Sequence, residues 1–241
     1  MKTKLACPQC AEGAGGIGGF FVETIRDDGL YTGQCPKGHK LLLATQTLRY
    51  EMLFEIALNA ISDGYYREAV SSFAASVERF YEFAIRVLAL RAGLAPGVFS
   101  GAWKKVAAQS ERQVGAFVFM YAQAFGEVPL ILDAKKPLDV SELRNAVVHK
   151  GKLPSCGEAI DFGRAAYGVI QAGVSGLRRL CVDEVNIALA EHVAGIAAKM
   201  GNRYPRSFQV TPTALNVIDD LSGGFKPFDQ HLQARGIAPL L

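Results

Sequence analysis

Apolar residues recur at helical spacing through the middle of the chain, from about residue 46 to residue 201. Residues 46–64 follow this spacing and stop at Asp-Gly, which predicts a first helix. Residues 65–93 carry one continuous apolar stripe and end at Gly93, which predicts a long amphipathic helix. The stripe consists of Val70, Phe73, Val77, Phe80, Tyr81, Ala84, Val87 and Leu88.

Three further helices are expected after this one. The third starts near Ser100 and ends at Gly126. The fourth is short, has an N-cap at Asp139 or Ser141, and stops at Gly151.

The fifth helix runs from about residue 155 to residue 201 and is either long or broken. Ser155 followed by Glu158 is a capping-box signature at its start. Several glycines lie inside it, and they indicate either kinks or close contacts between helices.

The first 45 residues have a different pattern, rich in glycine and in short β-like runs. Strands are expected at 20–25, 30–35 and 40–45. The turn at 26–30 contains Asp-Gly between strand-like residues, which predicts a hairpin of the first two strands. This segment therefore reads as a small β module.

These patterns predict a mainly α protein in three parts. Residues 1–45 form the β module, residues 46–201 form a helical bundle, and residues 202–241 form a C-terminal extension with prolines and shorter patterns.

Composition narrows the class of protein only slightly. The formal net charge is +3, which permits a polyanionic partner without arguing for one. The N-terminal stretch "MKTKLACPQC" has no apolar run after its basic start, and the most apolar windows are too short to span a bilayer. We therefore expect a cytoplasmic protein with no membrane partner, in which five cysteines indicate metal binding or burial rather than disulfides.

Four residues of the β module have the spacing of a metal site. Cys7 and Cys10 form a C-x2-C pair, Cys35 and His39 form a C-x3-H pair, and 24 residues with the expected hairpin separate the pairs. Zinc takes four such ligands from two tight turns, and a site filled by four protein ligands is structural. The alternative is three unrelated buried cysteines and a surface histidine.

The module resembles a zinc ribbon, in which the metal supplies folding energy that a core of this size lacks. Ribbons bind nucleic acid, bind proteins or cap a domain, and this one has no basic stripe that selects among these roles. Cys156 and Cys181 lie in helical sequence and are expected in the core.

A second group of polar residues ends the fourth helix. Asn145 and His149 are four residues apart and share a face, whereas Arg144 is about 140° away from His149 around the axis. His149 lies in the last turn, where the helix dipole favours a protonated imidazole. Basic residues at a helix C-terminus are also expected for dipole and capping reasons alone.

The segment "RNAVVHKG" resembles the R-x4-6-H signature of the HEPN superfamily (higher eukaryotes and prokaryotes nucleotide-binding), in the form where Asn follows the Arg. The upstream helix "REAVSSFAASVERFYEF" is similar to a HEPN second helix. The resemblance covers roughly residues 46–200 and implies a HEPN-like helical bundle.

This resemblance implies a metal-independent endoribonuclease that acts as a homodimer on RNA. Arg144 would hold the scissile phosphate, and His149 would move protons for attack by the RNA 2′-OH, which leaves a 2′,3′-cyclic phosphate. Asn145 would orient His149 or contact the phosphate. Lys150 and Lys152 would lie along the RNA backbone.

Glu78, in the middle of the long helix, is a candidate polar partner for this site. Its other interpretation is a surface residue four positions from Glu82.

Three functions follow from these features. The first is an RNA-cleaving enzyme of a bacterial toxin-antitoxin or phage-defence system. The second is a non-catalytic HEPN-like dimer that recruits a protein partner through its zinc module. The third, a catalytic zinc hydrolase, ranks last because the chain has no H-E-x-x-H motif and its metal ligands are already four. The run "GAGGIGG" precedes the first strand, so it is a loop and not a dinucleotide fingerprint.

Overall fold

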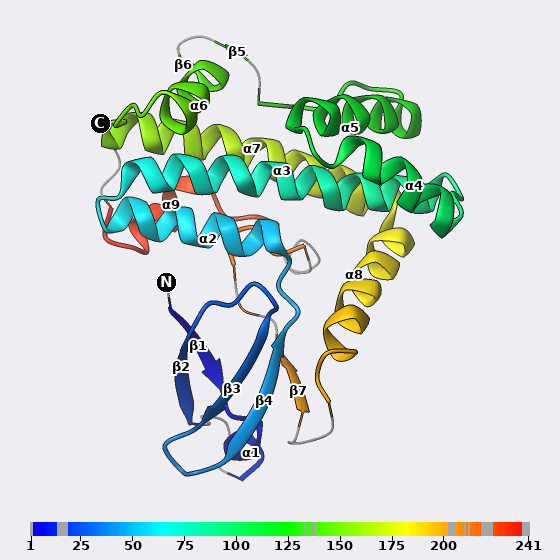
Figure 1. The fold of residues 1–241 in the computed structure, drawn as a ribbon. Coiled ribbons are helices and arrows are strands. Elements are labelled where there is room, and N and C mark those ends of the chain that lie inside the picture. Colours follow the sequence, from blue (N-terminus) through cyan, green and yellow to red (C-terminus); the bar gives the residue numbers. More distant parts are fainter. Residues whose placement is uncertain are drawn as a thin grey trace. The chain divides into compact units, whose positions relative to one another are not determined.

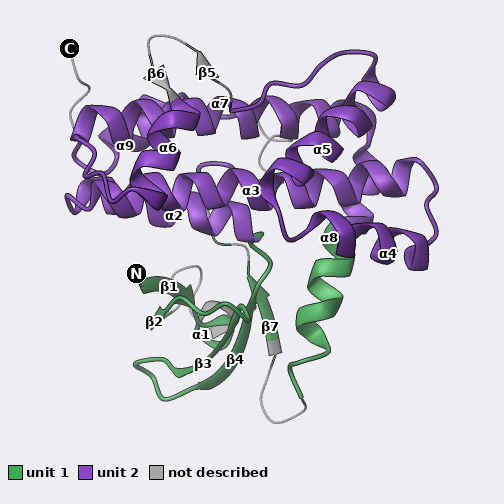
Figure 2. Cartoon of the chain, turned by 45° about the horizontal axis from the view of Figure 1, so that its top comes forward, with its two compact units in different colours: residues 1–48, 189–212 green, residues 49–188, 213–241 purple. Residues whose placement is uncertain are grey.

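The structure of the chain is a computed structural model. It describes residues 2–13, 19–132, 134–135, 138–201, 206–209, 211, 213–217 and 224–237. These residues are mainly helical, with small sheets near the N-terminus, which confirms the predicted fold class at this level. The chain divides into two compact units (Figure 2). The first contains residues 1–48 and 189–212, and the second contains residues 49–188 and 213–241.

In its described residues, the first unit holds two small sheets, one short helix and the end of a longer helix, α8 (Val182–Ala197), that comes from the second unit (Figure 1). Its elements are β1 (Lys2–Ala6), α1 (Pro8–Gly13), β2 (Phe20–Thr24), β3 (Leu30–Gln34), β4 (Lys40–Thr45) and β7 (Arg206–Gln209). Strands β1 and β2 pair antiparallel, β3 and β4 pair antiparallel, and β7 adds to β4 in parallel.

The predicted hairpin of the first two strands is wrong, although its turn is present. Gly29 has φ +66°, and Asp28 accepts hydrogen bonds from the Leu30 backbone N–H (3.1 Å) and the Arg26 guanidinium (3.1 and 3.2 Å). However, β2 pairs with β1, a strand that the sequence pattern did not predict, and β3 pairs with β4. The turn therefore connects strands of two different sheets.

Strand β4 is buried on both faces, which explains its continuous apolar run "KLLLAT". Leu41 and Leu43 pack in the core that contains the cysteines. Leu42 and Ala44 point the other way and pack against Ile196 and other apolar side chains of the same unit. This alternation follows from the period of two in a strand.

The second unit is a helical bundle built on one long helix. Its helices are α2 (Arg49–Ser62), α3 (Tyr66–Arg91), α4 (Pro96–Val106), α5 (Ser110–Phe125), α6 (Val140–His149), α7 (Cys156–Leu180), α8 (Val182–Ala197, which continues into the first unit) and α9 (Phe228–Gln233), with the short strands β5 (Ala134–Lys135) and β6 (Leu138–Asp139). Helix α3 contacts α2, α5, α6 and α7 (Figure 1). All eight residues of its predicted stripe are buried, which confirms that helix and its face.

The third predicted helix is wrong in its start and its continuity. It begins at Pro96 and is interrupted at residues 107–109, so that two helices, α4 and α5, replace it. The break is stabilised by the buried Gln113, whose Nε2 donates to the Ala107 carbonyl at 2.8 Å. The last carbonyls of a helix have no partner within the helix, and a side chain can supply one.

The last long helix is broken at Cys181, which is buried. Its start has the predicted capping box, since Ser155 Oγ accepts from the Glu158 N–H and Glu158 accepts from the Ser155 N–H. The glycines inside α7 make close helix contacts. A Cβ placed on Gly163 would stand 2.7 Å from the Phe73 ring, and one on Gly173 would overlap the Phe80 ring.

The C-terminal part of the second unit packs on α2 through buried carboxylates. Glu51 accepts from the Val217 N–H at 2.9 Å, and Glu55 accepts from the Ala214 N–H at 2.7 Å. Glu55 also forms an ion pair with Arg235. No helix among the residues described above is long and apolar enough to cross a membrane.

Candidate functional site

The two predicted ligand pairs of the first unit come together in one cluster. Cys7 directly follows β1, Cys10 lies on α1, Cys35 directly follows β3, and His39 directly precedes β4. His39 Nδ1 lies 3.6 Å from Cys7 Sγ, 3.3 Å from Cys10 Sγ and 3.5 Å from Cys35 Sγ. Cys10 Sγ and Cys35 Sγ are 3.7 Å apart, and all four ligand atoms lie within 4.8 Å of one another.

These separations suit a single metal ion. Ligands at tetrahedral corners, about 2.3 Å from zinc for sulfur and about 2.0 Å for nitrogen, stand roughly 3.5 to 3.8 Å apart. The three cysteines are buried and His39 is half-buried, and none of the chain's five cysteines forms a disulfide. The cluster predicted from sequence is therefore confirmed as a group that could bind a metal.

In the second ligand pair, the surroundings of Cys35 favour its thiolate form. Burial acts to raise the pKa of Cys35, but the backbone N–H groups of His39 and Lys37, together with the thiols of Cys10 and Cys7, outweigh burial and lower that pKa to about 6. A thiolate is the form of cysteine that binds metals. The turn itself closes through hydrogen bonds from the Cys35 N–H to the His39 carbonyl and from the Gly38 N–H to the Cys35 carbonyl.

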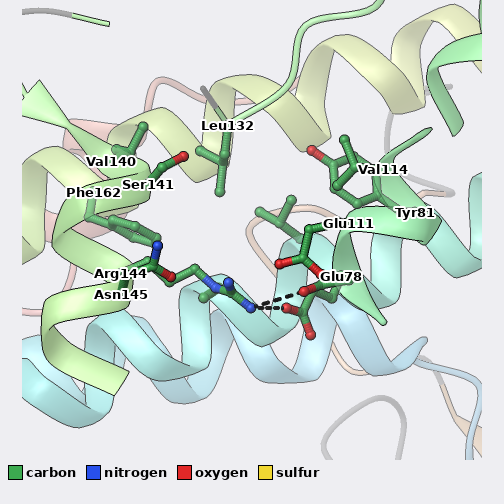
Figure 3. Close-up of a pocket in the computed structure, with 13 residues that line it drawn as sticks. Glu78, Tyr81, Glu111, Val114, Leu132, Val140, Ser141, Arg144, Asn145 and Phe162 are labelled. Atoms are coloured by element: carbon green, nitrogen blue, oxygen red, sulfur yellow. Dashed lines mark hydrogen bonds and ion pairs between the residues drawn. The ribbon is translucent and has the colours of Figure 1, made fainter. Parts of the chain in front are cut away.

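In the second unit, an ion pair joins α6 to α3. Arg144 Nη2 lies 2.5 Å from Glu78 Oε1 and 3.4 Å from Ser110 Oγ at the start of α5 (Figure 3). The side chains of Arg144 and Glu78 are each about one quarter exposed. Glu78 is therefore a partner of Arg144, which is the first of the two interpretations that its sequence position allowed.

Arg144 and Glu78 line a pocket of about 310 Å³ between α3, α5, α6 and α7. Its polar lining consists of Glu78, Ser110, Glu111, Ser141, Arg144 and Asn145. Its apolar lining consists of Ala74, Val77, Tyr81, Val114, Leu132, Val140 and Phe162. Figure 3 shows Glu111 projecting toward Glu78 and Arg144 from the first turn of α5.

His149 lies outside this pocket. It is exposed in the last turn of α6 and is not among the pocket residues, whereas Asn145, one turn earlier, is. The helical phase predicted that Arg144 and His149 do not share a face, and the structure places them accordingly. One chain thus places Arg144 and Asn145 in a pocket that Glu78 and Glu111 also line, and it leaves His149 exposed to solvent.

Helix α6 ends as the sequence predicts. Gly151 has φ +71°, and the N–H groups of Lys150 and Lys152 both donate to the Ala146 carbonyl, at 3.1 and 3.0 Å. Lys150 is exposed. Lys152, also exposed, forms an ion pair of 2.6 Å with Glu158, the glutamate of the capping box at the start of α7. The hydrogen bond from Lys152, followed by that from the Ser155 N–H, lowers the pKa of Glu158.

Sequence reasoning missed Ser110 and Glu111 as pocket residues. Both lie at the start of α5, and the single helix expected there hid that start. The pair Ser-Glu after Gln109 is a helix-start signal, and it indicates the break that the structure shows.

The chain matches no protein-family model, no curated protein and no solved structure. What can be inferred of its function therefore comes from its own residues, their geometry, and the motif that they carry.

Proposed function

We propose that this protein is a metal-independent endoribonuclease of the HEPN type that acts as a homodimer. One observation carries the proposal. Glu78 holds Arg144 beside Asn145 at a pocket of the helical bundle, on the same short helix that exposes His149. Arg144 has five N–H donors, and its only hydrogen bonds to described residues come from Nη2. The donors on Nε and Nη1 therefore remain for a phosphate.

In this proposal the residues divide the chemistry as follows. Arg144 binds the scissile phosphate and offsets the charge that develops on it. His149 takes the proton of the 2′-OH as that oxygen attacks phosphorus. The bond from phosphorus to the 5′ oxygen breaks, and the leaving oxygen takes a proton from water. Asn145 shares a face with His149 and contacts the phosphate or orients the imidazole. Lys150 adds positive charge for the RNA backbone, and Lys152 does so from its ion pair with Glu158.

A second chain completes the site. Within one chain His149 stands apart from the pocket that contains Arg144. Two α6 helices facing each other across a two-fold axis would bring His149 of one chain to the phosphate held by the other.

For the cluster of the first unit we propose zinc as the metal. Three thiolates and one imidazole are soft or borderline ligands that suit zinc, and with four protein ligands the ion is structural. In this role the zinc module supports the nuclease by contacting RNA or a protein partner.

The test is RNA cleavage by purified, metal-loaded protein without added Mg²⁺. Wild type should leave 2′,3′-cyclic phosphate ends, and His149→Ala and Arg144→Ala should each lower the rate by about 100-fold or more. Arg79→Ala is the matched control, because Arg79 also pairs with a glutamate of α3 but lies outside the pocket. Overexpression in bacteria should arrest growth with wild type and not with His149→Ala, as a toxin or defence enzyme requires.

Mixing the two inactive variants tests the shared site. A heterodimer of Arg144→Ala and His149→Ala retains one intact Arg144 and one intact His149, so cleavage should partly return. If wild type leaves RNA and tRNA uncut, the nuclease proposal is wrong.

A second candidate is a non-catalytic dimeric scaffold. The observation in its favour is that Glu78 already satisfies Arg144 as an internal ion pair between helices. A stoichiometric protein partner whose binding His149→Ala leaves unchanged, together with no RNA cleavage, would select this function.

A further inference from the structure

The pocket beside Arg144 is more acidic than phosphate binding requires. The lining contains two carboxylates, Glu78 and Glu111, and one guanidinium, Arg144, so these three groups carry one formal net negative charge. A phosphate placed deep among them would meet like charges. In the nuclease proposal Arg144 binds its phosphate at the edge of this pocket, so the space between the carboxylates suits a neutral ligand.

The walls of the pocket are largely apolar. Tyr81 and Phe162 are buried aromatic residues, and Val77, Val114 and Leu132 supply further apolar surface. A volume of about 310 Å³ lies at the lower end of small-molecule pockets, which hold about 300–1,000 Å³. A planar heterocycle with polar edges fits such a space, and nucleobases are bound in this way between apolar side chains.

The polar edge of the pocket presents one unpaired carboxylate. Glu111 is exposed, its side chain projects toward the pocket, and it forms no hydrogen bond or ion pair with any residue in the described part of the chain (Figure 3). A carboxylate accepts two parallel hydrogen bonds when its partner has two adjacent N–H donors. Asn145 adds an exposed amide, which donates and accepts.

Among the RNA bases, guanine has the matching edge. Its N1–H and its exocyclic amino group are adjacent donors that meet one carboxylate, and its O6 and N7 are acceptors for an amide or guanidinium. Adenine and cytosine turn a ring nitrogen acceptor toward the same carboxylate, and uracil flanks its single N–H with two carbonyls.

We propose that this pocket binds a guanine base of the RNA substrate, with Glu111 as the residue that determines specificity. This inference rests on the proposed nuclease function and names its substrate preference. Glu111 accepts from the guanine N1–H and amino group, and the Asn145 amide donates to O6. The ribose and phosphate then run from Asn145 toward His149, which is one helical turn of about 5.4 Å further along α6.

The experiment is calorimetric titration of the full-length, metal-loaded protein with guanosine monophosphate and, separately, with the adenosine, cytidine and uridine monophosphates. Guanosine monophosphate should bind at least tenfold more tightly than the other three. Guanosine, which has no phosphate, should keep its preference over adenosine, and inorganic phosphate should not displace it.

Glu111→Gln should reduce the preference for guanosine over adenosine by about tenfold, because the amide replaces one acceptor oxygen with a donor. Glu127→Gln is the matched control, since Glu127 lies just past the other end of α5, outside the pocket, and pairs with Arg179. Circular dichroism confirms that both variants are folded.

The results separate this proposal from the nuclease proposal. Guanine preference without RNA cleavage would support the pocket and contradict the nuclease. RNA cleavage with equal binding of all four nucleotides, with no nucleotide bound, or with Glu111→Gln indistinguishable from Glu127→Gln would overturn the guanine pocket.

Discussion

Arg144 Nη2 lies 2.5 Å from Glu78 Oε1, and this ion pair joins two helices whose paired residues are 66 positions apart in the chain. By contrast, the pair between Arg79 and Glu82 is local to α3. A local pair helps one helix, whereas a pair between helices fixes how α6 sits on α3. The orientation of Arg144 therefore depends on Glu78.

Replacement of Glu78 by Gln should lower both stability and activity. The side chains are about one quarter exposed, so solvent screens the pair and the expected loss of unfolding free energy is about 1 kcal/mol. If the nuclease proposal holds, cleavage should fall at least tenfold, because Arg144 loses the group that orients it. Urea denaturation and RNA cleavage at saturating substrate measure the two effects.

Glu82→Gln is the control, since it breaks an ion pair on the same helix without touching the pocket. It should change stability by less than Glu78→Gln and leave cleavage unchanged. A double-mutant cycle of Glu78→Gln with Arg144→Gln isolates the pair itself. Zero coupling in that cycle would show that the ion pair contributes nothing.

The metal ligands, the long helix α3 and the ends of α6 could be predicted from the sequence. The spacing of the cysteines predicted that Cys7 and Cys35 share one cluster, which the structure contains. The helical spacing of the apolar residues predicted the buried face of α3. These features depend on the spacing of residues that are close in the sequence, and such spacing can be read without knowledge of the tertiary structure. The Arg144–Glu78 contact was only one of two interpretations, because helical period says which face a residue occupies and not which helix it meets.

Features that depend on distant segments were not predicted. Strand β7 pairs with β4, although more than 160 positions separate them in the sequence. Strand β2 pairs with β1, whereas the Asp-Gly turn predicted that it would pair with β3. For these strands the deciding partner lies outside the window in which the pattern is read. The break before α5, where Ser110 and Glu111 begin a helix, is local instead, since Gln113 donates to the Ala107 carbonyl six positions earlier. It was missed because a single helix was expected there.

Removal of the metal should unfold the first unit. Its core contains the three cysteines of the cluster together with a few apolar residues such as Tyr31 and Leu43, so a metal bound there would supply much of its folding energy. Elemental analysis should find one zinc ion per chain in wild type and none in Cys7→Ser. Limited proteolysis of Cys7→Ser should then cleave within residues 1–48 and spare the helices of the second unit.

Cys156→Ser is the matched control, because Cys156 is half-buried and outside the cluster. It should keep its zinc and its protease resistance. A Cys7→Ser protein that retains full metal content would contradict the assignment of ligands.

Gly173→Ala should destabilise the second unit by about 1 to 3 kcal/mol. The added Cβ would overlap the ring of Phe80, which is fully buried and cannot easily move. In Gly168→Ala, on the same helix, the new Cβ would meet only Leu130 among the described residues, at an ordinary 3.9 Å. Helix propensity should therefore raise stability by up to about 1 kcal/mol. Equal effects of the two variants in urea denaturation would contradict the close packing of α7 on α3.

His231 should make the second unit less stable below neutral pH. Burial lowers the pKa of His231 in the folded protein, and the charges of Arg235 and Lys226 lower it further. The unfolded chain therefore binds a proton more readily than the folded one, and the stability from neutral His231 is complete above about pH 6.5. It is lost progressively as the pH falls from there through the folded pKa.

His231→Gln removes this titration while keeping a polar side chain on α9. The variant should be less stable than wild type at pH 7.5, because the ring packs beside Tyr167 at 5.9 Å between centroids. Its unfolding free energy should nevertheless fall less steeply than that of wild type between pH 7.5 and pH 5.5. Urea midpoints at pH 7.5, 6.5 and 5.5 measure both slopes, and parallel slopes would assign the loss of stability to other groups.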